Sequence, residues 1–228
     1  MTSAQHLLDQ ACGKTEDHLC TVAGLPGLFH RQMVDDLQAL CADARQAGFQ
    51  LSVASSFRSF ERQLAIWSGK VSGGRPVLDS GGQPLAIQTL TEEELMWAIL
   101  RWSALPGASR HHWGTDIDVF DGSAVSEDYQ LQLVPAEYSG EGPFSTLTDW
   151  LTERIADGRA YGFFRPYAND CGGVAPEPWH LSYAPVAQQY AALQTPENLL
   201  PLWRAVKLPL LPQVEAHIDE IVTRFIRV

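Results

Sequence analysis

The feature that most constrains this chain is a set of metal-binding side chains that lies in two short segments far apart in the sequence. The first segment, residues 109–119, holds two histidines and two aspartates around one glycine. The second segment, residues 177–180, supplies another carboxylate and another imidazole. Zinc binds histidine nitrogen and carboxylate oxygen, and a catalytic zinc site keeps one position open for water. A fold that joins the two segments would therefore provide the ligands of a catalytic zinc site and a spare glutamate as base.

The first segment needs a turn before its side chains can meet. His111 and Asp118 are seven residues apart, so one straight strand would place them on opposite faces. Gly114 lies between them and allows a turn that brings both to one point. Asp116 and Asp118 share a face if that part is extended, with the apolar residues beside them facing the core. The alternation of a strand therefore does not show whether Asp116 or Asp118 is the metal ligand.

Two other metal-site patterns do not fit the chain. A His-Glu-x-x-His helix motif is absent from the sequence. Asp116, Asp118 and Glu127 fall at the offsets of a calcium-binding loop. However, Phe120 occupies a ligand position of that loop and Asp121 stands where a glycine is needed. We therefore reject a calcium loop.

Composition limits the class of protein. The chain has 228 residues, which suits one domain, or one domain with an appendage, and 45% of them are hydrophobic. The formal net charge of −11 argues against nucleic acid or an anionic membrane as the main partner. We expect no membrane span, because no apolar run reaches about 18 residues. The N-terminal residues lack the basic start and apolar run of a signal peptide, so we expect a cytoplasmic protein. The four cysteines form no Cys-x-x-Cys pair, and we expect reduced thiols.

Helix and strand patterns alternate along the chain and predict an α+β fold. Residues 1–28 are predicted as an arm, or a short helix plus a loop, and residues 69–90 as a loop rich in glycine and proline. A capping box at Thr91 to Glu94 opens one of the helices. We expect helices over residues 30–47, 60–67, 91–103 and 146–156, and from 185 to the end with one break at Pro209 and Pro212. We expect strands over residues 50–55, 129–134, 161–164 and 179–183.

Two spaced motifs resemble a known family. Ser109-x-His111-x-x-Gly114-x-x-x-Asp118, followed by Glu177-x-x-His180, resembles the signature of the zinc D-alanyl-D-alanine carboxypeptidase/dipeptidase family. That family includes the VanY and VanX enzymes and shares its fold with the Hedgehog signalling domain. Residues 56–59 with Gln63 are similar to an upstream element of the same family, and the resemblance covers about residues 50–185.

The resemblance implies a fold and a division of the chain. The expected fold is a small central antiparallel sheet with flanking helices. It implies a zinc peptidase domain, which we expect over residues 29–185, and the poorly patterned residues 1–28 are expected to form an N-terminal arm. Residues 186–228 would form a C-terminal helical extension packed on the same domain.

The resemblance also implies the site. His111, Asp118 and His180 would bind one zinc ion per chain, and Glu177 would be the general base. Arg58 would meet the substrate's carboxylate or the developing oxyanion, since its guanidinium offers a fork of donors suited to a carboxylate.

Four further residues are predicted substrate contacts in the cleft: Ser109, Gln63, Asp116 and Trp179. Asp116 departs from the family, which usually has a small residue there. The extra carboxylate has three open roles: orienting His112, binding a substrate ammonium, or none. His112 itself is expected to be exposed to solvent or to contact one of the metal-binding residues, and not to bind the metal. Trp179 is expected to be a cleft wall or part of the core rather than a side chain that stacks on the substrate.

The implied function is a zinc-dependent peptidase that cleaves D-alanine-containing cell-wall peptides, with a peptidoglycan-derived peptide as its partner. Two alternatives stay open. One is a zinc-containing peptide-binding module that has lost catalysis. The other, within the enzymes, is a D,D-dipeptidase or a muropeptide endopeptidase.

Overall fold

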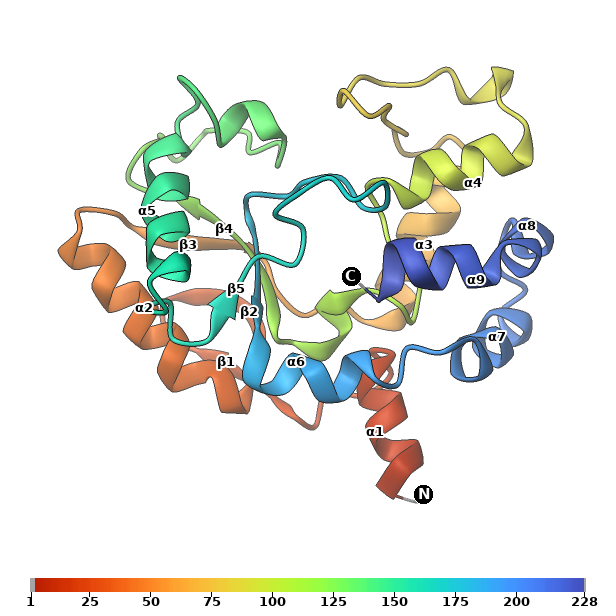
Figure 1. Cartoon of the computed structure of the whole chain (residues 1–228), viewed down its shortest axis with the longest axis horizontal. Helices are drawn as coiled ribbons and strands as arrows, with labels where there is room; N and C mark the ends of the chain where they lie inside the picture. The colour runs from red at the N-terminus through yellow and green to blue at the C-terminus, as the bar shows by residue number, and fades with distance from the viewer. Residues whose placement is uncertain (1–2, 228) are drawn as a thin grey trace.

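A small antiparallel sheet lies at the centre of the molecule and is flanked by helices (Figure 1). The computed structural model describes residues 3–227. Four strands pair in the order β3-β4-β6-β5, each antiparallel to its neighbour, and β1 and β2 form a separate hairpin. The predicted α+β fold is therefore confirmed. The strands are β1 Leu19–Val22, β2 Leu25–His30, β3 Leu51–Ser55, β4 Asp116–Asp121, β5 Phe163–Phe164 and β6 His180–Tyr183.

Three of the four predicted strands are present, as β3, β5 and β6. The strand predicted over residues 129–134 is wrong. The carboxylate of Glu137 accepts hydrogen bonds from the backbone N–H of Gln132 at 3.0 Å and of Val134 at 3.3 Å. Leu133 between them has a left-handed φ of 53°. The backbone donors that a strand would pair with a neighbour are thus bound to a side chain, so the alternating sequence forms a loop.

The four helices predicted before residue 185 are present, with ends that differ by up to four residues from the prediction. The capping box is present: Thr91 Oγ1 accepts from Glu94 N at 3.2 Å, and Glu94 Oε2 accepts from Thr91 N at 2.8 Å. The helix predicted from residue 30 begins later, because His30 ends a strand and a 3-10 turn follows it. The helices are α2 Val34–Gln46, α3 Phe60–Val71, α4 Glu92–Leu100 and α5 Ser145–Ala156.

The first 30 residues contain more structure than predicted. The short helix is present as α1 Ser3–Ala11, but the predicted loop holds the β1–β2 hairpin. Phe29 of this hairpin is fully buried and belongs to the core of the sheet. The backbone N–H of His30 donates to Gly114 O at 2.9 Å. The hairpin therefore supports the turn that carries the histidines, while the division of the chain at residues 28 and 185 stays a prediction.

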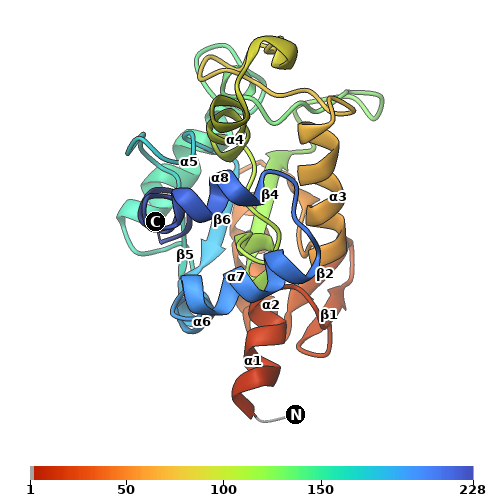
Figure 2. The ribbon, with the colours of Figure 1, turned by 90° about the vertical axis from the view of Figure 1, so that its right-hand side faces the viewer.

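The C-terminal part is helical, as predicted, and covers the side of the molecule next to α4 (Figure 2). Besides the expected break there is another at residues 192–195. Two tryptophans join this part to the rest of the chain: Trp67 Nε1 donates to Pro209 O at 2.9 Å, and Trp203 Nε1 donates to Pro106 O at 2.7 Å. The helices are α6 Ala184–Ala191, α7 Pro196–Ala205, α8 Leu211–Ala216 and α9 Ile218–Ile221, followed by a π-helical turn Val222–Ile226.

The buried apolar residues form two main cores, and residues 105–119 pass from one to the other. Leu105 and Ala108 belong to the core of α4 and the C-terminal helices. Trp113 and Ile117 belong to the core between the sheet, α2, α5 and α6. The segment with the motif histidines is therefore anchored at both ends. The four cysteines form no disulfide. Within residues 3–227 no helix is both long enough and apolar enough to span a membrane.

Replacing Gly114 by alanine should destabilise the protein more than the same change at Gly48. Both glycines have positive φ, 68° and 94°, so alanine is strained at either position by about 1–2 kcal/mol. A Cβ on Gly114 would also lie 2.4 Å from Leu19 Cδ2, whereas nothing lies within 4 Å of one on Gly48. We expect about 1–3 kcal/mol of additional loss for Gly114→Ala in urea unfolding. Equal losses in the two variants would contradict the packing of the hairpin on this turn.

Candidate metal centre

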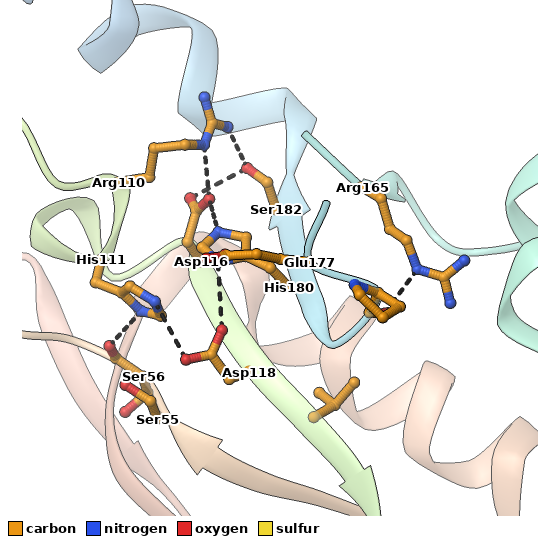
Figure 3. Close-up of polar contacts among 12 residues, drawn as sticks. Ser55, Ser56, Arg110, His111, Asp116, Asp118, Arg165, Glu177, His180 and Ser182 are labelled. Atoms are coloured by element: carbon orange, nitrogen blue, oxygen red, sulfur yellow. Dashed lines mark hydrogen bonds and ion pairs between the residues drawn. The ribbon is translucent and has the colours of Figure 1, made fainter. Parts of the chain in front are cut away.

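Three of the predicted residues converge at one point. Within residues 3–227, His111, Asp118 and His180 form a group whose ligand atoms all lie within 4.8 Å of one another. His111 Nε2 lies 3.4 Å from Asp118 Oδ2, and His180 Nδ1 lies 3.2 Å from Asp118 Oδ1 (Figure 3). The left-handed turn at Gly114, after the 3-10 turn Arg110–Trp113, joins His111 to the strand that carries Asp118.

The register of β4 and β6 brings the two distant segments together. Asp118 is the cross-strand partner of His180, and Asp116 is the partner of Ser182. Because side chains alternate along a strand, these four share one face of the sheet. Ile117 points to the opposite face and is fully buried in the core, as the alternation predicts.

Each histidine has one ring nitrogen bound to an acceptor and the other directed to the centre. His111 Nδ1 lies 2.9 Å from the carbonyl of Ser56, and His180 Nε2 lies 2.9 Å from Asp116 Oδ1. A carbonyl or carboxylate only accepts, so these nitrogens carry the protons. His111 Nε2 and His180 Nδ1 keep their lone pairs facing Asp118. Metal-bound histidines are held in this way, with the second nitrogen donating to an outer acceptor.

Two buried atoms in the centre lack a partner. Asp118 Oδ1 and His180 Nδ1 have no hydrogen bond within the described part of the chain. A buried polar atom without a partner costs free energy, so such atoms are normally satisfied by a ligand, water or ion. Two imidazole nitrogens and a carboxylate oxygen are the donors that zinc prefers. The residues present therefore fit a zinc ion.

The electrostatics of the centre favour a positive charge. Burial alone would raise the pKa of Asp118, but the neighbouring imidazoles of His111 and His180 hold it well below its usual range. Burial would lower the pKa of His180, but the hydrogen bond to Asp116 and the nearby carboxylates of Asp118 and Glu177 raise it well above its usual value. Three carboxylates thus surround one imidazole, and a divalent cation would balance them.

Asp116 lies behind His180 and not in the cleft. It is fully buried, and its carboxylate contacts Arg110 Nε at 2.8 Å, Thr115 Oγ1 at 2.8 Å and Ser182 Oγ at 3.1 Å, besides His180. Burial would raise the pKa of Asp116, but the charge of Arg110 and the hydrogen bond from His180 hold it well below its usual range. The structure therefore does not place Asp116 against a substrate, in contrast to our prediction; it orients His180.

His112 is part of the scaffold and is not solvated. Its side chain is fully buried; Nδ1 lies 2.5 Å from the carbonyl of Arg58, and Nε2 accepts from Gly107 N at 2.9 Å. Burial lowers the pKa of His112 to about 3, so the ring stays neutral. Asp116 does not contact it. His112 instead fixes the backbone of Arg58 beside the histidine turn.

A cleft of about 410 Å³ opens over the centre. Ser109 and Trp179 line it, as predicted, although both are nearly buried and Trp179 also packs on Tyr138. Glu177 lines it too, and its Oε2 lies 3.3 Å from His180 Nδ1. Two grooves of about 710 and 740 Å³ lie elsewhere, but neither is lined by the three grouped ligands.

Arg58 lines the same cleft and is held by two neighbours. Its Nη1 donates to Gln63 Oε1 at 2.9 Å and its Nη2 to Ser55 Oγ at 3.2 Å. Gln63 is fully buried and also donates to Ala104 O at 2.7 Å. Gln63 therefore does not line the cleft as predicted; it positions Arg58. Burial lowers the pKa of Arg58, while the charges of Asp118 and Glu177 act in the opposite direction.

Sequence reasoning missed the residues that support the site. Arg110 and Ser182 bind each other at 2.6 Å and both bind Asp116. Arg165 Nε donates to Pro178 O at 2.9 Å, and Tyr167 O accepts from Glu177 N at 2.9 Å. Ser182 was detectable, since it lies two residues after His180 on the same strand face. Arg165 and Tyr167 gave no such signal, because their contacts depend on how a loop folds back.

Replacing a metal ligand should weaken zinc binding more than replacing the carboxylate behind it. His180→Ala removes a ligand and should abolish tight binding. Asp116→Asn removes the charge behind that ligand and should weaken zinc affinity about 10- to 100-fold. His217→Ala is the control, because His217 pairs with Glu93 away from the cleft. Competition with a chromophoric chelator measures the affinities, with circular dichroism as the check on folding. Full zinc occupancy in His180→Ala would show that the ligand assignment is wrong.

Comparison with known proteins gives a consistent family. Residues 27–186, more than half of the chain, match the profile described as VanY: D-alanyl-D-alanine carboxypeptidase. An uncharacterized protein of Haemophilus influenzae is 33% identical over 124 residues, 54% of this chain and 92% of that protein. A D-alanyl-D-alanine carboxypeptidase of Enterococcus faecalis is 29% identical over 153 residues, which are 64% of this chain and only 45% of the enzyme.

Two solved structures share the fold. VanYB in complex with D-Alanine-D-Alanine superposes with a TM-score of 0.52 at 23% identity, covering 76% of this chain and 82% of that one. The LdcB LD-carboxypeptidase gives a TM-score of 0.52 at 20% identity, covering 87% and 78%. The sequence match over residues 27–186 and the shared fold lead to one conclusion: this chain belongs to the VanY D-alanyl-D-alanine carboxypeptidase family.

Proposed function

We propose that this protein is a zinc-dependent peptidase that removes a C-terminal D-alanine from cell-wall peptides. One observation carries the proposal: a His-Asp-His centre, a neighbouring carboxylate and a fixed arginine line the same cleft. Family membership supports the substrate class. So does the likeness to VanYB, whose structure holds D-Alanine-D-Alanine. The partner would be a peptide derived from peptidoglycan, and a cytoplasmic site of action stays a prediction.

His111, Asp118 and His180 would hold one zinc ion per chain. Zinc bound by three protein ligands supplies a Lewis acid that polarises a carbonyl and lowers the pKa of water to about 7. The two histidines keep their lone pairs directed inward because Ser56 and Asp116 accept the protons on their outer nitrogens. On metal binding the inward nitrogens would carry no proton, as a histidine ligand requires.

Glu177 is the proposed general base. It lines the cleft beside the ligand His180, and only 14% of its side-chain surface is exposed. Its carboxylate would take the proton of the attacking water and later give it to the leaving amine nitrogen. The turn that carries it is fixed, because Tyr167 O accepts the N–H of Glu177 and Arg165 binds the carbonyl of Pro178. The base is therefore held near the metal ligands before the substrate binds.

Arg58 is the proposed anchor for the substrate. Gln63 and Ser55 accept from different terminal nitrogens of its guanidinium, so the orientation of the fork is fixed. A peptide whose C-terminal carboxylate meets this fork would end one residue beyond the carbonyl at the metal. That geometry gives a carboxypeptidase or a D,D-dipeptidase. An endopeptidase would use Arg58 for the oxyanion instead, and a binding module without catalysis would need neither the base nor the fork.

Glu177→Gln should keep zinc and lose activity. The glutamine cannot take the proton, so we expect kcat on a D-alanyl-D-alanine peptide to fall about 10²- to 10⁴-fold. Zinc content by mass spectrometry of metals should stay near one per chain. Glu153→Gln, on the exposed side of α5, is the matched control. Loss of zinc in Glu177→Gln would make Glu177 a ligand, and unchanged activity would remove it from the mechanism.

Arg58 should make the enzyme sensitive to the peptide's C-terminus. Removing a charge-assisted hydrogen bond from the transition state lowers kcat/KM about 10- to 150-fold, so amidating the C-terminal carboxylate should cost the wild type about that factor. In Arg58→Ala amidation should cost little, and Arg58→Lys should recover only part of the discrimination. Equal cleavage of the free acid and the amide by the wild type would favour the endopeptidase alternative.

A further inference from the structure

Two cations of the cleft are not used by the proposed mechanism. Lys70 is in the last turn of α3, and Arg75 follows in the next loop; both line the cleft over the metal centre. Neither side chain has an ion pair or a hydrogen bond within residues 3–227. In contrast, Arg110 in the same cleft is paired with Asp116.

The cleft carries an excess of positive charge in an acidic protein. The chain has a formal net charge of −11, yet Asp118 and Glu177 are the only carboxylates that line the described cleft. A zinc ion would balance those two. Three positive charges then remain on one wall: Arg58, Lys70 and Arg75. Like charges gathered in a cleft attract anions and raise their local concentration.

The chain holds Lys70 and Arg75 close together. Arg75 N donates to Gly69 O at 2.9 Å, and the Arg75 side chain lies over Gly69, 3.1 Å from where a Cβ would stand. Burial lowers the pKa of Lys70, and the charge of Arg75 lowers it further. The same charge also acts on Arg58. Like charges held together repel one another, and an anion bound between them would relieve that repulsion.

We propose that Lys70 and Arg75 form a second anion subsite that binds a carboxylate within the peptide, in addition to the C-terminal carboxylate at Arg58. The inference rests on the proposed peptidase function and adds the substrate class: peptides with a free side-chain or branch carboxylate. Lys70 follows Phe60, the first residue of α3, by ten positions, or about 15 Å along the axis. An extended peptide covers this length in about four to five residues. Because the cationic side chains are long, the carboxylate belongs about two to four residues before the C-terminal residue.

The test compares two peptides that differ only in charge. Both end in D-alanyl-D-alanine, and one carries glutamate where the other carries glutamine, two, three or four residues before the end. The variants are Lys70→Gln, Arg75→Gln and the double variant. Arg62→Gln is the matched control, because Arg62 is an exposed cation of α3 that does not line the cleft.

We expect the wild type to prefer the glutamate peptide at one position by about 5- to 50-fold in kcat/KM, less than for a fully buried contact because Arg75 is exposed. The preference should fall to about twofold or less in the double variant, persist in Arg62→Gln and shrink at about 0.5 M salt. Equal rates for both peptides at every position, or a preference that survives the double variant, would overturn the subsite.

A binding measurement separates this proposal from the proposed function. Fluorescence anisotropy with labelled glutamate and glutamine peptides gives the dissociation constants in the Glu177→Gln background, with and without the double substitution, where cleavage does not interfere. If no peptide is cut, the peptidase function fails. Tighter binding of the glutamate peptide that disappears in the double variant would still support the subsite. Equal binding of both peptides would reject it.

Discussion

The pairing of β4 with β6 is the constraint on which the rest of the site depends. Asp118 pairs with His180 and Asp116 with Ser182. These two cross-strand pairs place two candidate metal ligands and the two residues that support them on one face of the sheet. A shift of one residue in this register would turn the side chains of one strand to the opposite face, so Asp118 and His180 would no longer meet. The register is held by Ile117 on the other face, which is fully buried. The hydrophobic pattern of the strands therefore determines the chemistry of the polar face.

The sequence predicted the ligand group because its signals are local. Histidine, glycine and aspartate at set offsets describe a turn followed by a strand, and the structure contains both. The sequence predicted structure less well where a side chain, and not a neighbouring strand, accepts the hydrogen bonds of the backbone. Residues 129–134 alternate like a strand, but Glu137 binds their N–H groups. The β1–β2 hairpin was missed because few of its residues alternate clearly between apolar and polar.

Asp116 shows a further limit of sequence reasoning. If that part was extended, Asp116 was expected to share a face with Asp118, but whether it faces a substrate or a neighbour depends on Arg110 and Ser182, which lie outside this pair. A buried carboxylate is costly without partners, and removing one partner of a buried ion pair typically costs about 3–5 kcal/mol. Asp116 has four partners and no exposed surface. An additional carboxylate at this position is therefore tolerated because a neighbouring arginine balances it.

Charge balance also explains why the two walls of the cleft differ. At the metal centre, Arg110 balances Asp116 behind His180, and the metal that His111, Asp118 and His180 would hold balances the carboxylates that line the cleft. On the α3 wall, cations stand without carboxylates. Folding alone gains nothing from unpaired cations held near one another, since repulsion between them opposes the compact state. Their placement is consistent with a ligand that supplies the missing negative charges, and a peptide with two carboxylates is the simplest ligand that would reach both ends of that wall.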